Sequence, residues 1–349
     1  MTATVTTVSV FLAVLTVLVI AHELGHFVVA RVAGIRVLEF GFGYPPRVLS
    51  ITRGLTTYSL NLLPLGGFVK MLGENGEVVQ SDSFGAQPKL ARAAVLVAGS
   101  AMNLMLAPIC LTIALMLGEM SPCDGCGRVQ IYGVQPGMAS AEAGVRDGDL
   151  IMAIDGAPIT DAAGVRQAVR VSEGRPVSLR LRRLSDVFEL SVTPRMNPQT
   201  NALALGISLG PEYVLERLPI AEALPVSLTR TGEMVVNMVT GLAKVVVREA
   251  PAELAGPVGI AEMTGRAARA GTPTLLQFMA FLSLNLAIFN ILPVPGLDGA
   301  RLLFVGIEAV RGKRVNPQVE GALHLAGMLL LLALMLVVSF RDIQKLVAS

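Results

Sequence analysis

Residues 22 to 26 read His-Glu-Leu-Gly-His, and they lie inside an apolar segment long enough to cross a membrane. Positions i and i+4 of an α-helix share one face, so His22 and His26 could bind one Zn²⁺, with Glu23 as general base on a metal-bound water. The motif also occurs by chance on soluble helices. Residues 2 to 21 carry no charge, however, and imidazoles and carboxylates are costly in hydrocarbon, so this setting favours a functional site.

Composition places the whole chain among membrane proteins. Hydrophobic residues make up 53%, charged residues 15%, and the mean hydropathy is +0.63. Four apolar runs reach the roughly 20 residues that a bilayer requires, namely 2–30, 93–118, 271–297 and 321–340. The first run lacks a basic flank and cleavage would remove HELGH, so we expect it to be retained rather than to act as a signal peptide. A net charge of +2 without a basic tract gives no support for nucleic-acid binding.

The distribution of Lys and Arg predicts the orientation. The loops between runs one and two and between runs three and four are rich in these residues, so both are expected to be cytoplasmic. The N-terminus, the segment 119–270 and the C-terminus then lie outside. Arg341 and Lys345 in the tail run mildly against this assignment.

A catalytic zinc usually has three protein ligands and one open position. Asp298 follows the third run at the same expected depth as the two histidines, so we predict it as the third ligand. A lone carboxylate there could instead cap the span at the interface. Pro293 and Pro295 break the helix just upstream, and broken backbone at membrane depth is tolerated where it lines protein or a water-filled cavity.

Residues 36 to 72 alternate β-branched, aromatic and glycine residues, which predicts hairpin strands with turns at 44–47 and 52–54. The simplest interpretation is a small cytoplasmic sheet. Apolar positions at helical spacing within 218–250 predict a helix, either on the outer membrane surface or as a packed connector. Cys110 is expected to pack as a small hydrophobe. Cys123 and Cys126 have CxxC spacing, for which a local disulfide is favoured over a redox or second metal site, since no thioredoxin-like context or second cysteine pair is present.

Residues 127 to 195 read strand, loop, short helix, strand, and their glycine pattern around Gly133–Gly144 and Gly148–Gly156 resembles a PDZ domain of the circularly permuted bacterial type. PDZ domains bind extended peptides by strand addition. The domain could recognise new C-termini left by a prior cut, or act as a size filter that bars intact substrates.

Several motifs together resemble the site-2 protease family of intramembrane zinc metalloproteases (M50), closest to the bacterial regulator of sigma-E protease (RseP) group. They are HELGH, the NILPVPGLDG stretch Asn290–Gly299, and three further segments: Asn61–Glu74, Ala98–Asn103 and Gly256–Ile260. Many members of that group carry two tandem PDZ domains, whereas 119–270 has room for one.

The resemblance implies a polytopic α-helical membrane protein with four transmembrane helices, a membrane-associated β-hairpin sheet and one extracytoplasmic PDZ domain. The expected division is 1–35, first span; 36–90, β region; 91–118, second span; 119–196, PDZ domain; 197–270, connector with an amphipathic helix; 271–300, third span with LDG; 301–320, cytoplasmic loop; 321–349, fourth span and tail.

The resemblance also implies a function. One zinc ion per chain would serve to hydrolyse a peptide bond within or near the span of single-span membrane proteins already trimmed outside, such as anti-sigma factors or remnant signal peptides. This would be regulated intramembrane proteolysis, at a site near the cytoplasmic side of the cell membrane. The sheet edge would pair with the unwound substrate, and the implied substrate-binding residues are Asn290, Asn285, Gly66 and Gly67. Either asparagine could instead only form a hydrogen bond between helices.

Two other functions are weighed against proteolysis. A non-proteolytic PDZ membrane scaffold with a relic metal site would be expected to have lost Glu23 or a ligand. A zinc-dependent sensor or transporter predicts more polar residues along the spans, and it does not explain a carboxylate between the histidines.

Overall fold

The computed structural model describes residues 2–74, 80–123, 128–197, 202–249 and 255–348. Two compact units result: the helical unit, residues 1–118 with 217–349, and the β-rich unit, residues 119–216. Cys123 is disulfide-bonded, but Cys126 lies outside the described residues, so the predicted pairing stays a prediction.

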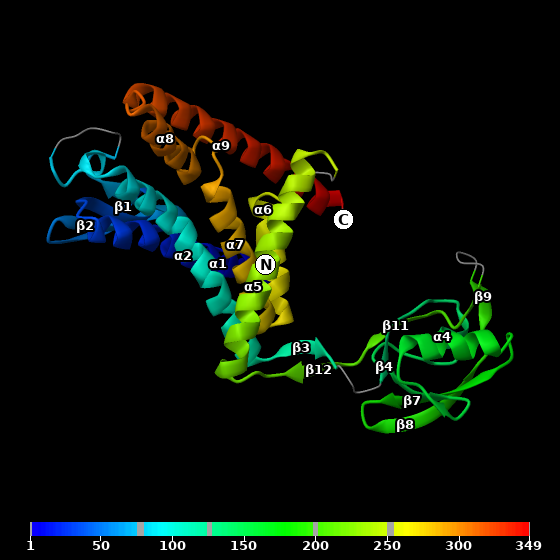
Figure 1. The fold of residues 1–349 in the computed structure, drawn as a ribbon. Coiled ribbons are helices and arrows are strands. Elements are labelled where there is room, and N and C mark those ends of the chain that lie inside the picture. The colour runs from blue at the N-terminus through cyan, green and yellow to red at the C-terminus, as the bar shows by residue number, and fades with distance from the viewer. Residues whose placement is uncertain (1, 75–79, 124–127, 198–201, 250–254, 349) are drawn as a thin grey trace. The chain divides into compact units, whose positions relative to one another are not determined.

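Long helices dominate the helical unit (Figure 1). They are α1 (Thr2–Val32), α2 (Lys89–Leu117), α5 (Ile220–Val246), α6 (Pro257–Ala270), α7 (Thr272–Ile291), α8 (Asp298–Arg311) and α9 (Pro317–Ala348). Within the described residues, α1, α2, α7 and α9 are long and apolar enough to cross a membrane. The prediction of four such runs is therefore confirmed.

Helix α2 is the central element of this unit, because α1, α5, α7 and α8 all pack against it. Cys110 is buried in α2, as expected, beside Ala280 and Leu284 of α7. Helix α5 contributes Met234 and other apolar side chains to the same cluster. Its packing on α2 and α7 favours the packed connector over a helix lying apart on the membrane surface.

Strands β1 (Val37–Arg53) and β2 (Thr56–Met71) form one long antiparallel ribbon. Phe40 pairs with both Tyr58 and Val69, so the ribbon doubles back and its two halves lie side by side. The reversal falls at the expected turn 44–47, next to Gly43, whose φ of +78° suits glycine. The hairpin's own turn is at Gly54 and Leu55, close to the predicted 52–54.

One end of this ribbon packs against the helices. Val37 and Met71 are buried with Ala30 of α1 and Val95 of α2. Phe84, in the short 3-10 helix η1 (Phe84–Ala86), belongs to the same cluster. The ribbon is thus fixed to the two helices that carry the sequence motifs.

The β-rich unit centres on an antiparallel sheet with strand order β11-β4-β5-β7-β8, with β6 beside β5. Its elements are β3 (Glu119–Pro122), β4 (Val129–Val134), α3 (Ala139–Glu142), β5 (Leu150–Ile154), β6 (Ala157–Pro158), α4 (Ala162–Val171), β7 (Val177–Arg183), β8 (Asp186–Val192), β9 (Arg195–Asn197), β10 (Ala202–Ala204), β11 (Ile207–Pro211) and β12 (Tyr213–Glu216). Ile131, Ile151 and Leu179 are fully buried in its core.

Two differences from the sequence-based division concern element boundaries. Residues 197–216 were placed in a connector, but β11 pairs with β4 and packs Ile207 and Leu209 on the core of the β-rich unit. Residues 301–311 were placed in a loop, but they continue α8, which ends at Gly312 in the left-handed conformation typical of a helix C-terminus.

Candidate metal centre

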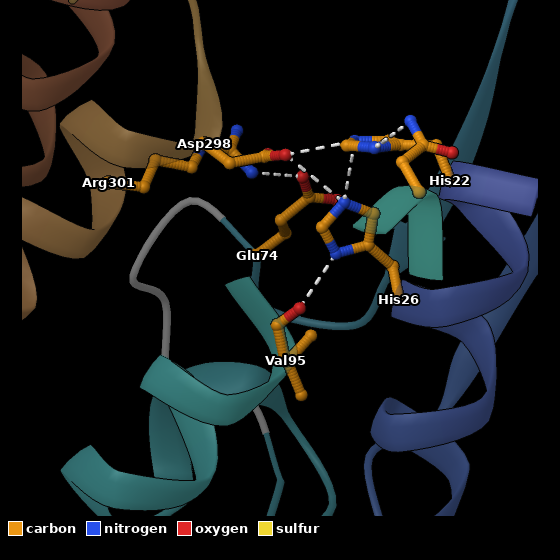
Figure 2. Close-up of polar contacts among 7 residues, drawn as sticks. His22, His26, Glu74, Val95, Asp298 and Arg301 are labelled. Atoms are coloured by element: carbon orange, nitrogen blue, oxygen red, sulfur yellow. Dashed lines mark hydrogen bonds and ion pairs between the residues drawn. The ribbon is translucent and has the colours of Figure 1, made fainter. Parts of the chain in front are cut away.

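Three side chains from distant parts of the helical unit converge on one point (Figure 2). His22 Nε2 lies 3.1 Å from Asp298 Oδ2, His26 Nε2 lies 3.2 Å from the same oxygen, and the two Nε2 atoms are 3.2 Å apart. Both histidines come from successive turns of α1, and Asp298 is the first residue of α8. These three form a group of potential metal ligands in the described part of the chain.

The dimensions of this triangle fit zinc. Ligand atoms about 2.0 Å from a tetrahedral zinc lie roughly 3.3 Å from one another. All three edges of the triangle are close to that length, and the donor set of two imidazoles and one carboxylate is one that catalytic zinc uses. Three protein ligands also leave the fourth tetrahedral position open for water or substrate.

Helix α2 forms one wall of the site through residues with little or no side chain. A Cβ at Gly99 would lie 2.4 Å from His26 Nε2 and 2.7 Å from His22 Nε2, so only glycine leaves room for both rings. A Cβ at Gly25 of α1 would lie 2.3 Å from the carbonyl oxygen of Ala98. The two helices therefore touch backbone to backbone beside the histidines.

The imidazole of His26 is oriented by a second contact. Its Nδ1 lies 2.7 Å from the carbonyl oxygen of Val95, and because a carbonyl can only accept, Nδ1 carries the proton. Nε2 of the neutral ring is then a free lone pair facing His22 and Asp298. Metal-binding histidines are typically held in this way.

Glu23 lies between the two histidines in sequence and faces the ribbon. A Cβ at Gly67 of β2 would lie 2.9 Å from Glu23 Cγ and 3.0 Å from Val19 of α1. The ribbon therefore approaches the motif helix at the position of the expected general base. Gly66, beside it, has φ +148° and packs against the ring of Tyr44.

Asp298 reaches the histidines because the chain breaks before it. Helix α7 ends at Ile291, and α8 begins at Asp298 after the two prolines. A Cβ at Gly299 would lie 2.4 Å from the carbonyl oxygen of Ile291, which shows how tightly the break is folded. One turn into α8, Arg301 forms an ion pair with Glu74 beyond the end of β2 (Figure 2).

The other expected site residues are placed as follows. Asn285 donates from Nδ2 to the carbonyl of Phe281 in its own helix, and Asn290 is half-buried one residue before the end of α7. Their roles toward a substrate, and those of Gly66 and Gly67, stay predictions. His324 of α9, the third histidine of the chain, was not among the expected site residues; its Nδ1 is buried and has no hydrogen-bond partner in the described part of the chain.

Sequence reasoning gave no role to three residues of α2 that face the histidines: Val95, Gly99 and Asn103. They follow one another at intervals of four, which is one helical face. That spacing was visible, but which face of α2 meets α1 depends on packing between helices.

Three features together define a class of protein, the metal-dependent hydrolases that work in membranes. They are a helix that carries HELGH, an Asp after a helix break, and four helices of membrane-crossing length. Comparison with known proteins agrees. The family model "Peptidase family M50" matches residues 10–334, and the chain belongs to this family. It is a zinc metalloprotease of the multi-pass membrane type, and zinc is its cofactor.

Individual relatives cover nearly the whole chain. A Clostridium perfringens protein, named as a candidate zinc metalloprotease, is 36% identical over 93% of this chain and 95% of its own. The regulator of sigma-W protease RasP of Bacillus subtilis is 30% identical over 98% and 99%, and the zinc metalloprotease RasP of Geobacillus kaustophilus 30% over 99% and 99%. Among solved structures, the PDZ domain of an SdrC-like protein from Listeria monocytogenes matches 23% of this chain and 85% of that one, at 18% identity and a TM-score of 0.21.

Proposed function

We propose that His22, His26 and Asp298 hold the zinc ion and that Glu23 is the general base of an intramembrane peptidase. The observation that carries this proposal is the triangle of Nε2, Nε2 and Oδ2 atoms with edges of 3.1 to 3.2 Å. Glu23 projects from the same helix, one residue after the first histidine. No other arrangement in the described residues combines three such ligand atoms.

Each residue has a distinct task in this proposal. When bound, the zinc ion would polarise the scissile carbonyl and lower the pKa of water toward ~7. Glu23 takes the proton from the attacking water and passes it to the leaving amine. The break between α7 and α8 gives water and an unwound peptide access to the site, since a regular helix would hide its peptide bonds.

The proposed substrates are single-span membrane proteins that another protease has already trimmed, for example anti-sigma factors or remnant signal peptides. The name of the Bacillus subtilis relative, regulator of sigma-W protease, supports this substrate class. The ribbon would receive the unwound substrate by strand pairing. Its strand residues Val48, Leu49 and Ile51 are apolar and exposed, as expected for a membrane-associated edge.

Asn290, Asn285, Gly66 and Gly67 are proposed to bind the substrate backbone. We also propose that the loops rich in Lys and Arg are cytoplasmic, so that the metal lies near the cytoplasmic face and the N-terminus and the β-rich unit outside. The β-rich unit would act as a PDZ-type domain. Strand β11 is a terminal strand of its sheet as described and packs beside α4, which leaves an edge for a peptide C-terminus.

The test compares purified full-length wild type, Glu23→Gln and Glu262→Gln with a tagged single-span substrate, with and without a chelator. Glu262 is an exposed carboxylate of α6 and provides the matched control. We expect cleavage by wild type and Glu262→Gln, loss in chelator with recovery on adding Zn²⁺, and no cleavage by Glu23→Gln. Equal cleavage by Glu23→Gln would overturn the assignment of the base.

A further inference from the structure

One face of α2 meets both histidines at three consecutive turns. Val95 accepts a hydrogen bond from His26 through its carbonyl oxygen, Gly99 leaves space for both rings, and Asn103 reaches His22. The Asn103 Nδ2 atom lies 3.4 Å from His22 Nδ1. The positions are four residues apart, so they share one helical face.

Asn103 is buried completely, at 0% exposure, although an amide is unfavourable inside a protein without hydrogen-bond partners. Its Oδ1 has no partner among the described residues. Among the described residues, His22 is therefore the one side-chain group that fixes how this amide is turned. A second anchor holds the backbone, because Ser283 Oγ of α7 donates to the carbonyl of Asn103 at 2.7 Å.

The chemistry of the imidazole decides which amide atom faces it. His22 points Nε2 at His26 and Asp298, so Nε2 must be a lone pair if it is to bind zinc. The proton of the neutral ring is then on Nδ1, which requires an acceptor opposite. Rotating the Asn103 amide by half a turn about χ2 exchanges Nδ2 and Oδ1, which have nearly the same shape. This rotation places the acceptor Oδ1 opposite His22 Nδ1.

We propose that Asn103 is a positioning residue for zinc: its Oδ1 accepts the Nδ1 proton of His22 and so directs Nε2 at the metal. Val95 does the same for His26 through its backbone. Helix α2 thus fixes the tautomer and the ring orientation of both ligands from one face. This inference rests on the proposed ligand set.

The test measures zinc affinity of the full-length protein by competition with a chromophoric chelator. Asn103→Leu removes the hydrogen-bond acceptor but keeps a side chain of similar size, and Asn103→Ala replaces it if leucine does not fit. Asn103→Asp has two acceptor oxygens and no amide nitrogen. Thr112→Val is the control, because it removes a buried hydrogen bond on the same helix, to Ser227, away from the histidines. Unfolding temperatures in excess chelator report on the fold without metal.

We expect Asn103→Leu and Asn103→Ala to lose zinc affinity by about 10- to 100-fold, the usual effect of removing a ligand's hydrogen-bond partner. Asn103→Asp should bind as tightly as wild type or more tightly, and Thr112→Val should bind as wild type does. Unchanged affinity in Asn103→Leu and Asn103→Ala would overturn the proposal. The proposal would also be overturned if Asn103→Asp lost as much zinc affinity as these variants while its unfolding temperature in chelator stayed unchanged. The amide nitrogen, and not the oxygen, would then be the group that supports zinc binding.

A parallel His22→Ala variant separates this inference from the proposed function. If His22→Ala keeps wild-type affinity, the ligand assignment itself is wrong. If His22→Ala loses zinc while Asn103→Leu keeps it, the ligands stand and the role of Asn103 is refuted.

Discussion

His22 Nε2 and Asp298 Oδ2 lie 3.1 Å apart although 276 residues separate them in the chain. Removing either of these two side chains should therefore prevent the protein from holding zinc. We expect His22→Ala and Asp298→Ala each to lose zinc and peptidase activity by more than ~100-fold, since even loss of an outer partner costs up to that much. Metal analysis after gel filtration, together with substrate cleavage, checks this. Zinc retained at one ion per chain by either variant would contradict it.

Gly99 is predicted to be intolerant of any side chain. The Cβ of Gly99→Ala would lie 2.4 Å from His26 Nε2, so a ring must move and zinc affinity should fall. Gly241 of α5 has no atom within 4 Å of such a Cβ, so Gly241→Ala should keep full activity and gain about 0.5–1 kcal/mol of stability. Equal activity of the two variants would show that α2 does not pack against the histidines as described.

Arg92 of α2 and Glu308 of α8 form a buried ion pair at 2.6 Å, and both side chains are about nine-tenths hidden. Burial alone would raise the pKa of Glu308, but the hydrogen bond from Arg92 outweighs it and the pKa lies below its usual value. We expect Glu308→Gln to destabilise the protein by about 3–5 kcal/mol, because Arg92 is left buried without its counter-charge.

Differential scanning fluorimetry in detergent measures this effect. The control is Glu262→Gln, whose exposed pair with Arg266 should contribute less than ~1 kcal/mol. The double variant Arg92→Leu with Glu308→Leu should recover most of the stability, since a buried pair can be replaced by apolar side chains. A Glu308→Gln protein as stable as its control would argue against close packing of α8 on α2.

The β-rich unit should lose stability in acid through Asp149. Burial would raise the pKa of this carboxyl, but the hydrogen bonds from Arg183 at 2.7 and 2.8 Å outweigh it and the folded pKa lies below its usual value. The stabilisation is therefore fully present above the unfolded pKa of about 3.9 and is lost as the pH falls through the folded value.

Hydrogen exchange of full-length protein, followed in peptides from β4 and β5 between pH 3 and 6, measures this dependence. Wild type should lose protection toward the acid end. Asp149→Asn should be less protected than wild type near pH 6 and should change less with pH. Parallel profiles for the two proteins would contradict the role of this ion pair.

The proposed metal ligands were accessible to sequence reasoning because each carries its own signal. HELGH has ligand spacing within one helix, and Asp298 follows a proline break at an expected depth that matches the histidines. Four apolar runs could be read directly from length and hydropathy. These features depend on local periodicity and on the membrane, which constrains helices strongly.

Other parts of the site depend on packing that local patterns do not encode. Asn103 could be matched to a motif, but its contact with His22 exists because Gly25 and Gly99 let α1 and α2 touch. Strand β11 was missed as part of the β-rich unit because its partner β4 lies some 75 residues earlier, and such long-range pairing leaves no local signal.

Zinc K-edge X-ray absorption of the purified full-length protein tests the central claim most directly. We predict nitrogen and oxygen ligands alone at about 2.0–2.2 Å, with the scattering pattern of two imidazoles, and the loss of one imidazole in zinc-loaded His26→Asn. Sulfur ligands at about 2.3 Å, or a spectrum unchanged in His26→Asn, would contradict the assignment of His22, His26 and Asp298 as the zinc site.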